Sequence, residues 1–134
     1  MAIPSSSVPR PQPHAGAARR APELRFRIRV TDAGTIAVGP GKVALLEAID
    51  KTGSITAAAK SLDMSYRRAW LLLDELNRSL RQPAVQSAKG GAAGGGSVLT
   101  DAGRDLITVY RTIESKAAVA CRAEIRKLMS MLAR

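Results

Sequence analysis

The stretch "SITAAAKSLDMSYRRAWLLLDELN", residues 54–77, decides the fold. Ser54 and Ser65 each precede an apolar run, and serine is a preferred residue at the N-cap of a helix. Residues 63–64 predict a tight turn between the two runs, and the alanines before them let a following helix approach closely. The stretch therefore predicts a short helix, a tight turn and a second helix over about residues 65–81.

The second predicted helix has one apolar face. At about 100° per residue, its apolar side gathers Ala69, Leu72, Leu73, Leu76 and Leu80. Tyr66 and Trp70 flank that side, and we expect Trp70 to pack in the core, whereas Tyr66 can pack its ring and still offer its hydroxyl to a phosphate. The residues that point away are Arg67, Leu71, Asp74 and Arg78. An outward Leu71 suits either a thymine methyl group or a protein partner.

Arg67 and Arg68 stand in the first turn of this helix, where the helix dipole disfavours positive charge by a few tenths of a kcal/mol each. A phosphate backbone or a guanine edge would offset that cost, because the free backbone N–H groups and both arginines would then face an anion. The alternative interpretation is a helix end that is simply solvated.

Upstream, "LRFRIRV" (24–30) alternates apolar residues with arginines, which predicts a half-buried strand. A turn at 31–34 and a short partner strand at 35–38 follow. We expect the arginines to keep an exposed sheet soluble; the alternative is a phosphate-binding stripe. Residues 39–53 predict a helix that ends at a left-handed Gly53, with Glu47 and Lys51 paired on its outer side.

Downstream, Pro83 stops the second helix, and residues 84–88 and 97–99 predict two strands around "KGGAAGGG" (89–96). Thr100 is expected to cap a last helix over about 101–132, with Asp101 in its first turn. Such a helix would be about 45 Å long, at about 1.5 Å per residue. A small domain cannot cover that length, so we expect its distal half to pair with a second copy; the alternative is a break near residues 117–120 or a frayed tail.

Composition narrows the classes of function. The 134 residues carry a net charge of +10, from 21 Lys and Arg against 11 Asp and Glu, which favours a polyanionic partner over a neutral one. Cys121 and His14 are the sole cysteine and histidine, so one chain cannot supply a four-ligand zinc site. A Ser/His/Asp or Cys/His catalytic set is implausible because His14 lies in the tail that we expect to be disordered. We therefore expect no enzyme activity, no metal and no cofactor. No apolar run approaches a membrane span, and a cytoplasmic, nucleoid-associated protein is expected.

A helix-turn-helix followed by two strands around a glycine-rich tip is the layout of a winged helix-turn-helix. The segment "TGSITAAAKSLDMSYRRAWLLLDELN", the glycine-rich loop and "VLTDAGRDL" resemble the N-terminal winged-helix domain of ModE-type molybdate-responsive regulators and, more distantly, the LysR-type DNA-binding domain. The resemblance covers about residues 24–115. It implies a cytoplasmic dimer that binds operator DNA through residues 65–68, with the glycine-rich loop as the wing. The sequence departs from this family in two ways. We expect no room for oxyanion-binding domains after the last helix, so molybdate sensing is not supported. In addition, Ala92–Ala93 stand where the wing of the family usually carries a basic residue.

The expected fold is mainly α with a small β component: a winged helix-turn-helix with a long C-terminal dimerisation helix. The expected segments are a disordered basic tail (1–22), the DNA-binding domain (23–100, wing 84–99) and the dimerisation helix (101–134). Candidate residues for binding double-stranded DNA are Ser54, Thr56, Ser65, Tyr66, Arg67, Arg68, Lys89, Gly90 and Gly91. Candidate homodimer residues are Ile113, Ala117, Cys121, Ile125, Leu128 and Leu132. The alternative functions are a small dimeric protein-interaction adaptor and an oxyanion-binding module.

Overall fold

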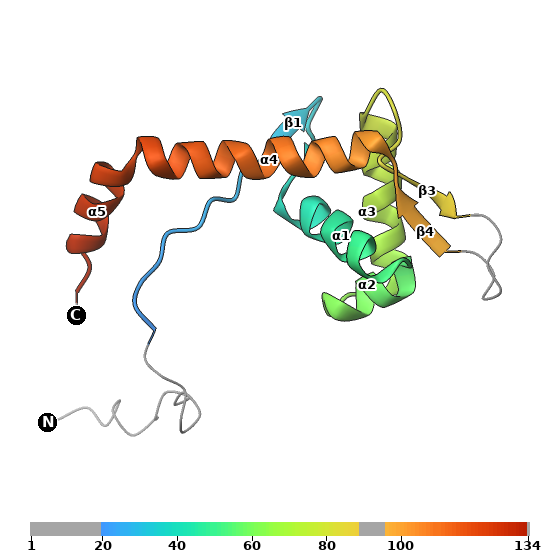
Figure 1. The fold of residues 1–134 in the computed structure, drawn as a ribbon, viewed down its shortest axis with the longest axis horizontal. Coiled ribbons are helices and arrows are strands. Elements are labelled where there is room, and N and C mark those ends of the chain that lie inside the picture. The colour runs from blue at the N-terminus through green and yellow to red at the C-terminus, as the bar shows by residue number, and fades with distance from the viewer. Residues whose placement is uncertain (1–19, 89–95, 134) are drawn as a thin grey trace, which may run out of the picture.

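The computed structural model describes residues 20–88 and 96–133. Its elements are β1 (Val30–Asp32), β2 (Thr35–Val38), α1 (Pro40–Thr52), α2 (Ile55–Ser61), α3 (Tyr66–Ser79), β3 (Val85–Ala88), β4 (Gly96–Leu99), α4 (Asp101–Ala120) and α5 (Arg122–Ser130). Figure 1 shows α1, α2 and α3 grouped at one end of α4, with α5 at the other end. The strands form two antiparallel pairs, β1–β2 and β3–β4, which confirms the predicted mainly helical winged helix-turn-helix.

Hydroxyl side chains start three of the helices, as predicted. Ser54 Oγ accepts a hydrogen bond from the backbone N–H of Ala57 at 3.0 Å, and Ser65 Oγ accepts one from Arg68 at 3.1 Å. Thr100 Oγ1 does the same for Gly103 at 3.1 Å. Each cap satisfies a backbone donor that the first helical turn leaves without a partner.

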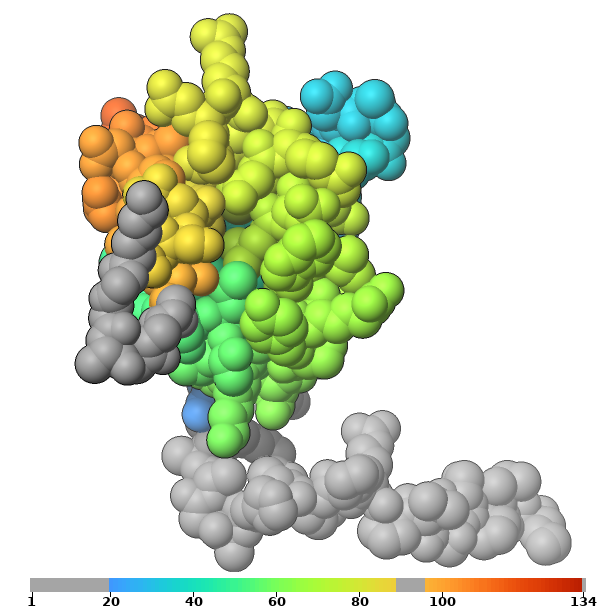
Figure 2. Space-filling view, turned by 90° about the vertical axis from the view of Figure 1, so that its right-hand side faces the viewer, coloured from blue at the N-terminus to red at the C-terminus, as the bar shows by residue number. Residues whose placement is uncertain are grey.

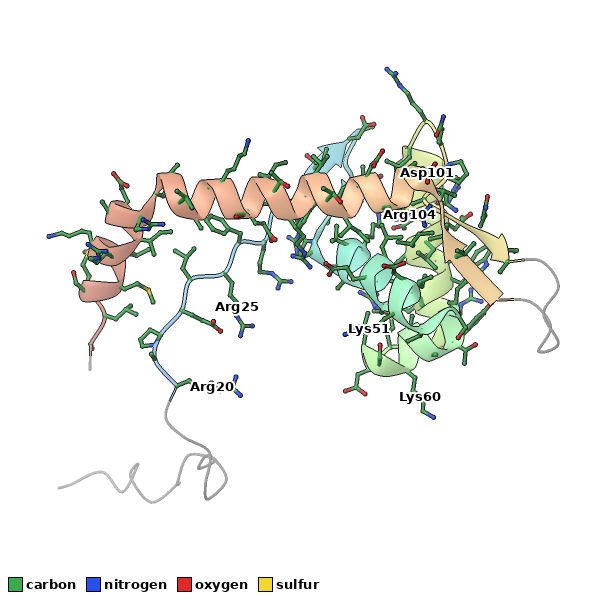
Figure 3. All side chains as sticks on the ribbon, in the orientation of Figure 1. Arg20, Arg25, Lys51, Lys60, Asp101 and Arg104 are labelled. Atoms are coloured by element: carbon green, nitrogen blue, oxygen red, sulfur yellow. The ribbon has the colours of Figure 1, made fainter. Side chains whose placement is uncertain are left out.

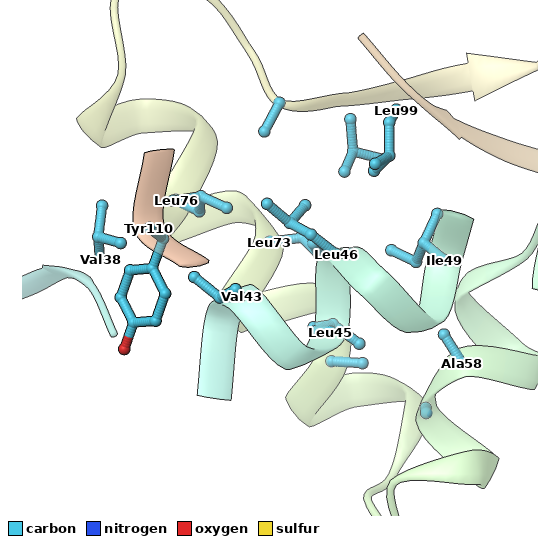
Figure 4. Packing of buried hydrophobic residues seen from close by; sticks show 14 of the residues in the cluster. Val38, Val43, Leu45, Leu46, Ile49, Ala58, Leu73, Leu76, Leu99 and Tyr110 are labelled. Carbon is cyan, nitrogen blue, oxygen red and sulfur yellow. The ribbon is translucent and has the colours of Figure 1, made fainter. Parts of the chain in front are cut away.

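The core is built around α1, which contacts α2, α3, α4 and β4. Its fully or almost fully buried side chains are Val43, Leu45, Leu46 and Ile49. Figure 4 shows Leu46 between α1 and the Leu73 and Leu76 side chains of α3. Each such side chain contributes about 1.5–3 kcal/mol through burial, so α1 fixes the positions of the surrounding helices.

The β3–β4 hairpin is held against the helical core at its base. Val85 pairs with Leu99 across the two strands, and both side chains are buried. The Asn77 side chain of α3 accepts a hydrogen bond from Ala84 N at 2.8 Å and donates one to the Val85 carbonyl at 3.2 Å. The predicted strands are confirmed, whereas residues 89–95 lie outside the part of the chain that the structure describes.

The predicted strand over 24–30 is wrong. Only Val30 of that stretch is in a strand, because the turn at Ala33 and Gly34, both with positive φ, pairs β2 with residues 30–32 alone. Residues 24–29 have no strand partner for their backbone and form an extended segment instead. The alternation persists up to Ile28, with apolar side chains half-buried and arginines exposed, but Val30 is exposed. The segment is anchored on α4, where the buried Tyr110 hydroxyl donates to the Ile28 carbonyl at 2.8 Å.

An ion-pair cluster joins α1 to α4 and replaces the pair expected between Glu47 and Lys51. Arg111 donates to Glu47 Oε1 at 2.6 Å and to Glu114 Oε1 at 2.7 Å. The hydrogen bond from Arg111 lowers the pKa of the Glu47 carboxyl, and the pKa of Arg111 is raised in turn. The planar guanidinium bonds Glu47 through two N–H groups and Glu114 through a third, a geometry that suits arginine better than lysine.

The predicted single helix over 101–132 is also wrong. α4 ends at Ala120 and α5 begins at Arg122, because Cys121 has φ −104° and ψ 18°, outside the helical range. Figure 1 shows α5 turning away from the axis of α4. The break lies next to residues 117–120, where the alternative interpretation placed it. The apolar spacing continues through Cys121, because periodicity reports which side of a helix is apolar and not whether its axis bends.

Replacement of Gly103 by alanine should destabilise the fold. A Cβ on Gly103 would clash with the Ala84 carbonyl oxygen, which also accepts the hydrogen bond from Thr100 N at 2.9 Å. We expect a loss of about 1–3 kcal/mol in the free energy of unfolding, measured by urea denaturation. The matched control is Gly41→Ala in α1, whose Cβ would meet nothing within 4 Å and should leave stability unchanged or raised. Equal effects of the two changes would contradict the tight contact at Gly103.

Replacement of Asn77 by alanine should loosen the β3–β4 hairpin. The change leaves Ala84 N and the Val85 carbonyl without their side-chain partner. We expect a loss of about 1–3 kcal/mol in stability and faster amide hydrogen exchange in β3. The neighbouring exposed Arg78 is the control, and Arg78→Ala should leave exchange in β3 unchanged. Unchanged exchange in Asn77→Ala would show that Asn77 does not anchor the hairpin.

Candidate nucleic-acid interface

The junction between α2 and α3 is a tight turn, as predicted. Met64 N donates to the Ala59 carbonyl at 3.0 Å, and Asp63 N donates to the Lys60 carbonyl at 3.2 Å. Asp63 takes a left-handed conformation with φ 57°, which aspartate tolerates better than most residues. These bonds fix the direction in which α3 leaves α2.

The two faces of α3 differ in the way that the sequence predicts, with one exception. Ala69, Leu73 and Leu76 are buried, and Arg67 and Arg68 are exposed together with Leu71. The exception is Trp70, which was expected in the core but is 48% exposed. Its ring lines an open hollow of about 220 Å³ between α3 and the β3–β4 hairpin. Helical spacing placed Trp70 at the edge of the apolar side, and that edge borders the hollow.

The charges on α3 divide into paired acids and unpaired arginines. Asp74 forms an ion pair with Arg78 at 2.9 Å, and Glu75 forms one with Lys42 at 3.2 Å. Arg67 and Arg68 have no carboxylate within ion-pair distance among residues 20–88 and 96–133. Residues 1–19 and 89–95 contain no Asp or Glu. The start of α3 therefore carries two positive charges that other side chains do not neutralise.

The hydroxyl residues predicted for the site lie at the starts of two helices. Ser54 and Ser65 are N-caps of α2 and α3, and Thr56 is exposed in the first turn of α2. A capping hydroxyl accepts from the backbone and still has its own proton to donate. Tyr66 is likewise exposed at the start of α3. Arg67, Arg68 and these four residues therefore lie on α2 and α3, near where the two helices begin.

Figure 2 shows α3 in the middle of one face, between the β3–β4 hairpin and the β1–β2 hairpin. The structure therefore brings the base of the wing beside α3. The predicted wing residues Lys89, Gly90 and Gly91 lie outside the described residues.

Sequence reasoning missed a basic hollow on the other side of α3. It measures about 240 Å³, and its charged lining consists of Arg27, Arg29, Lys42, Arg68 and Glu75. The favoured sequence interpretation assigned the first two arginines to a solvent-exposed sheet, and a phosphate-binding stripe was the alternative. The alternating arginines in 25–29 were visible in the sequence. No local pattern connects them with Arg68, because only the fold brings the extended segment beside α3.

The residues predicted for dimerisation are spread over α4 and α5. Ile113, Cys121, Leu128 and Leu132 are exposed, and Ala117 and Ile125 are half-buried. Figure 1 shows that the distal half of α4, together with α5, extends away from α1–α3. Four of the six residues are therefore left exposed by the rest of the described chain.

Within the described ranges, no helix has the length and apolar character that crossing a bilayer requires. The same residues contain no group of three or more His, Cys, Asp or Glu side chains placed to hold a metal ion.

Residues 41–104 match the family model described as the bacterial regulatory helix-turn-helix protein of the lysR family. The chain is 49% identical over 81 residues to the molybdenum-pterin-binding protein MopB of Rhodobacter capsulatus, a match that covers 60% of this chain and 30% of MopB. It is 44% identical over 93 residues to the molybdenum transport protein ModE of Azotobacter vinelandii, a match that covers 67% of this chain and 34% of that protein. It is 41% identical over 71 residues to the DNA-binding transcriptional dual regulator ModE of Escherichia coli K12, a match that covers 53% of this chain and 27% of that protein.

The chain thus spans about a third of the length of the curated relatives that it matches. The matched family model covers α1 to the start of α4, including the tight turn and both wing strands. Residues 41–104 thus match a helix-turn-helix domain of the bacterial LysR type, and the chain is similar in sequence to part of the ModE and Mop proteins.

Proposed function

We propose that this chain binds double-stranded DNA sequence-specifically, as a homodimeric transcriptional regulator. In this proposal α3 enters the major groove with Tyr66, Arg67 and Arg68 towards the bases and phosphates. The hydroxyls of Ser54, Thr56 and Ser65 bind phosphates at the helix starts. The wing, with Lys89, Gly90 and Gly91, lies against the sugar-phosphate backbone.

One observation carries the proposal: α3 is rigidly held by its buried face while its first turn presents unpaired arginines. Ala69, Leu73 and Leu76 fix the helix on α1, so the exposed side chains are positioned before a partner arrives. Neither arginine has to give up an internal ion pair to reach a phosphate or a guanine. Preorganised, unpaired donors of this kind suit a polyanion that is read by shape and by base edges.

The relatives support DNA binding more directly than they support a ligand. One of them is described as a DNA-binding transcriptional dual regulator, and the family model that matches residues 41–104 is that of a regulatory helix-turn-helix protein. Molybdenum appears in the names of other relatives, but the chain matches only about a third of their length. The proposal therefore takes over DNA binding and leaves out molybdate.

The dimer is proposed from the surface beyond the DNA-binding domain. Ile113 and Leu128 are each 49% exposed, and Val109 and Leu132 are exposed as well. Large apolar side chains repeated along two helices that extend from a small domain suit burial against a second copy. Two copies would also place two α3 helices on one duplex, as regulators of this architecture do.

The alanine double mutant Arg67→Ala/Arg68→Ala should lose sequence preference while keeping the fold. Selection from random duplexes with the wild-type chain supplies the preferred site, and fluorescence anisotropy then compares that site with a mixed-sequence duplex. We expect the ratio of the two affinities, at least about 10³ for a specific regulator, to fall towards one. The thermal melt should stay unchanged, because both side chains are exposed.

The matched control is Arg20→Ala/Arg25→Ala, which removes the same charge from a segment that Figure 3 shows away from α3. The control should keep the preference for the selected site. Full preference in the α3 double mutant would overturn the recognition-helix assignment. Absence of salt-dependent DNA binding by the wild type would instead favour the adaptor function, with the exposed Leu71 as part of a protein-binding face.

A charge placed on the exposed apolar surface of α4 and α5 should separate the proposed dimer. Sedimentation equilibrium at micromolar concentration should give a dimer for the wild type and a monomer for Ile113→Asp/Leu128→Asp. The control Thr108→Asp changes an exposed polar residue of α4 and should remain dimeric. A wild-type monomer, or a double mutant that dimerises normally, would contradict this interface.

A further inference from the structure

The exposed face of α3 has two flanks, and each flank is hollow. On the wing side, Trp70 and Asn77 line the hollow with residues of β3 and β4. On the other side, Arg68 and Leu72 line the hollow with the segment before β1, with β2 and with the start of α1. Figure 2 shows the two hairpins on opposite sides of α3. A helix in the major groove is likewise bordered by two phosphate backbones, one on each side.

The positive charges of the second hollow come from three parts of the chain. Arg27 and Arg29 come from the extended segment, Lys42 from the first turn of α1 and Arg68 from the first turn of α3. Arg29 lies close to the start of α1, because a Cβ on Gly39 would be in ordinary contact with Arg29 Cγ at 3.5 Å. The contact of Tyr110 with the Ile28 carbonyl holds the backbone between the two arginines. The segment is thus fixed at the point from which both side chains extend.

The charge of this hollow is positive and unpaired. Its one acid, Glu75, is neutralised by Lys42, which is only 4% exposed and also donates to the Ile36 carbonyl. Arg27, Arg29 and Arg68 have no carboxylate within ion-pair distance in the described parts of the chain. Three guanidinium groups around one concave surface repel one another unless an anion lies between them.

We infer that Arg27, Arg29 and Arg68 bind a phosphate of the DNA strand that runs along the flank of α3 opposite the wing. The inference rests on the proposed function, because it places α3 in the major groove. It adds a clamp: the wing contacts one backbone and the arginine hollow contacts the other. The ligand chemistry is that of a phosphodiester, and its source is the duplex.

The test compares Arg27→Ala/Arg29→Ala with Arg20→Ala/Arg25→Ala, which removes equal charge from nearby positions that do not line the hollow. Fluorescence anisotropy with a mixed-sequence duplex gives the dependence of log affinity on log salt concentration for each chain. Losing one or two phosphate contacts should reduce the magnitude of that slope by about 1–2 in Arg27→Ala/Arg29→Ala, with about tenfold weaker binding at physiological salt. The control should stay close to the wild type.

Ethylation interference on the selected site shows which phosphate contacts a variant has lost. In the wild type, ethylated phosphates should interfere on both strands that border α3. In Arg27→Ala/Arg29→Ala, interference should vanish on the strand away from the wing and persist on the other. Arg27→Lys/Arg29→Lys keeps the charge and should restore most of the slope, which separates loss of the contact from loss of the fold; thermal melts of all variants check the fold directly.

Each other result counts against the inference. If Arg27→Ala/Arg29→Ala binds DNA normally and its log affinity depends on log salt concentration with the same slope as in the wild type, the inference is overturned and the proposed function stays intact. Equal losses in both double mutants would indicate net charge rather than a built contact. Isothermal titration with inorganic phosphate covers a free anion: binding that these mutations abolish, without any change in DNA affinity, would make the hollow an oxyanion site. A wild-type chain without salt-dependent DNA binding would remove both proposals.

Discussion

The burial of α1 is the constraint on which the rest of the structure depends. Val43, Leu45, Leu46 and Ile49 are at most 1% exposed, and the helix that carries them contacts α2, α3, α4 and β4. α3 uses its small and branched residues, Ala69, Leu73 and Leu76, to pack against this core. Its polar residues are consequently turned outward, so the same contacts that stabilise the domain also present the arginines. Any change that shifts α1 shifts the proposed binding surface with it.

Features set by neighbouring residues were predictable from the sequence, and features set by distant partners were not. Ser54, Ser65 and Thr100 cap helices because a hydroxyl reaches a backbone N–H three residues later, which is a purely local bond. A strand instead needs a ladder partner, and residues 24–29 have none, so their alternation of apolar and charged residues predicted the buried side without predicting the strand. Cys121 illustrates a further limit, because the helical spacing of apolar residues is the same in a straight helix and in a broken one.

In the candidate site, too, residues placed by their neighbours were predictable and residues placed by distant parts of the chain were not. Arg67 and Arg68 could be found from the sequence, since their position in the first turn of a capped helix is unusual for positive charge. Arg27 and Arg29 could not be assigned a place beside Arg68, because that proximity depends on the route of the extended segment across α4 and the start of α1. Trp70 was misplaced for a related reason: the helical projection gives its direction, whereas its exposure depends on the hollow between α3 and the hairpin, which only the fold creates.

The pairing of the acids gives the surface its electrostatic character. Asp74 and Glu75 lie on α3 beside the proposed contact face, and both would repel a phosphate backbone if their charges were free. Arg78 and Lys42 neutralise them within the protein, at 2.9 and 3.2 Å. Arg67 and Arg68 at the start of α3, and Arg27 and Arg29 on its flank, have no ion-pair partner among the residues that the structure describes. A polyanion would then meet donors that have no internal partner to leave, so that binding releases counterions from the duplex without breaking an ion pair in the protein. Lys42 therefore acts indirectly: by occupying Glu75, it leaves the three arginines of the hollow free for an external anion.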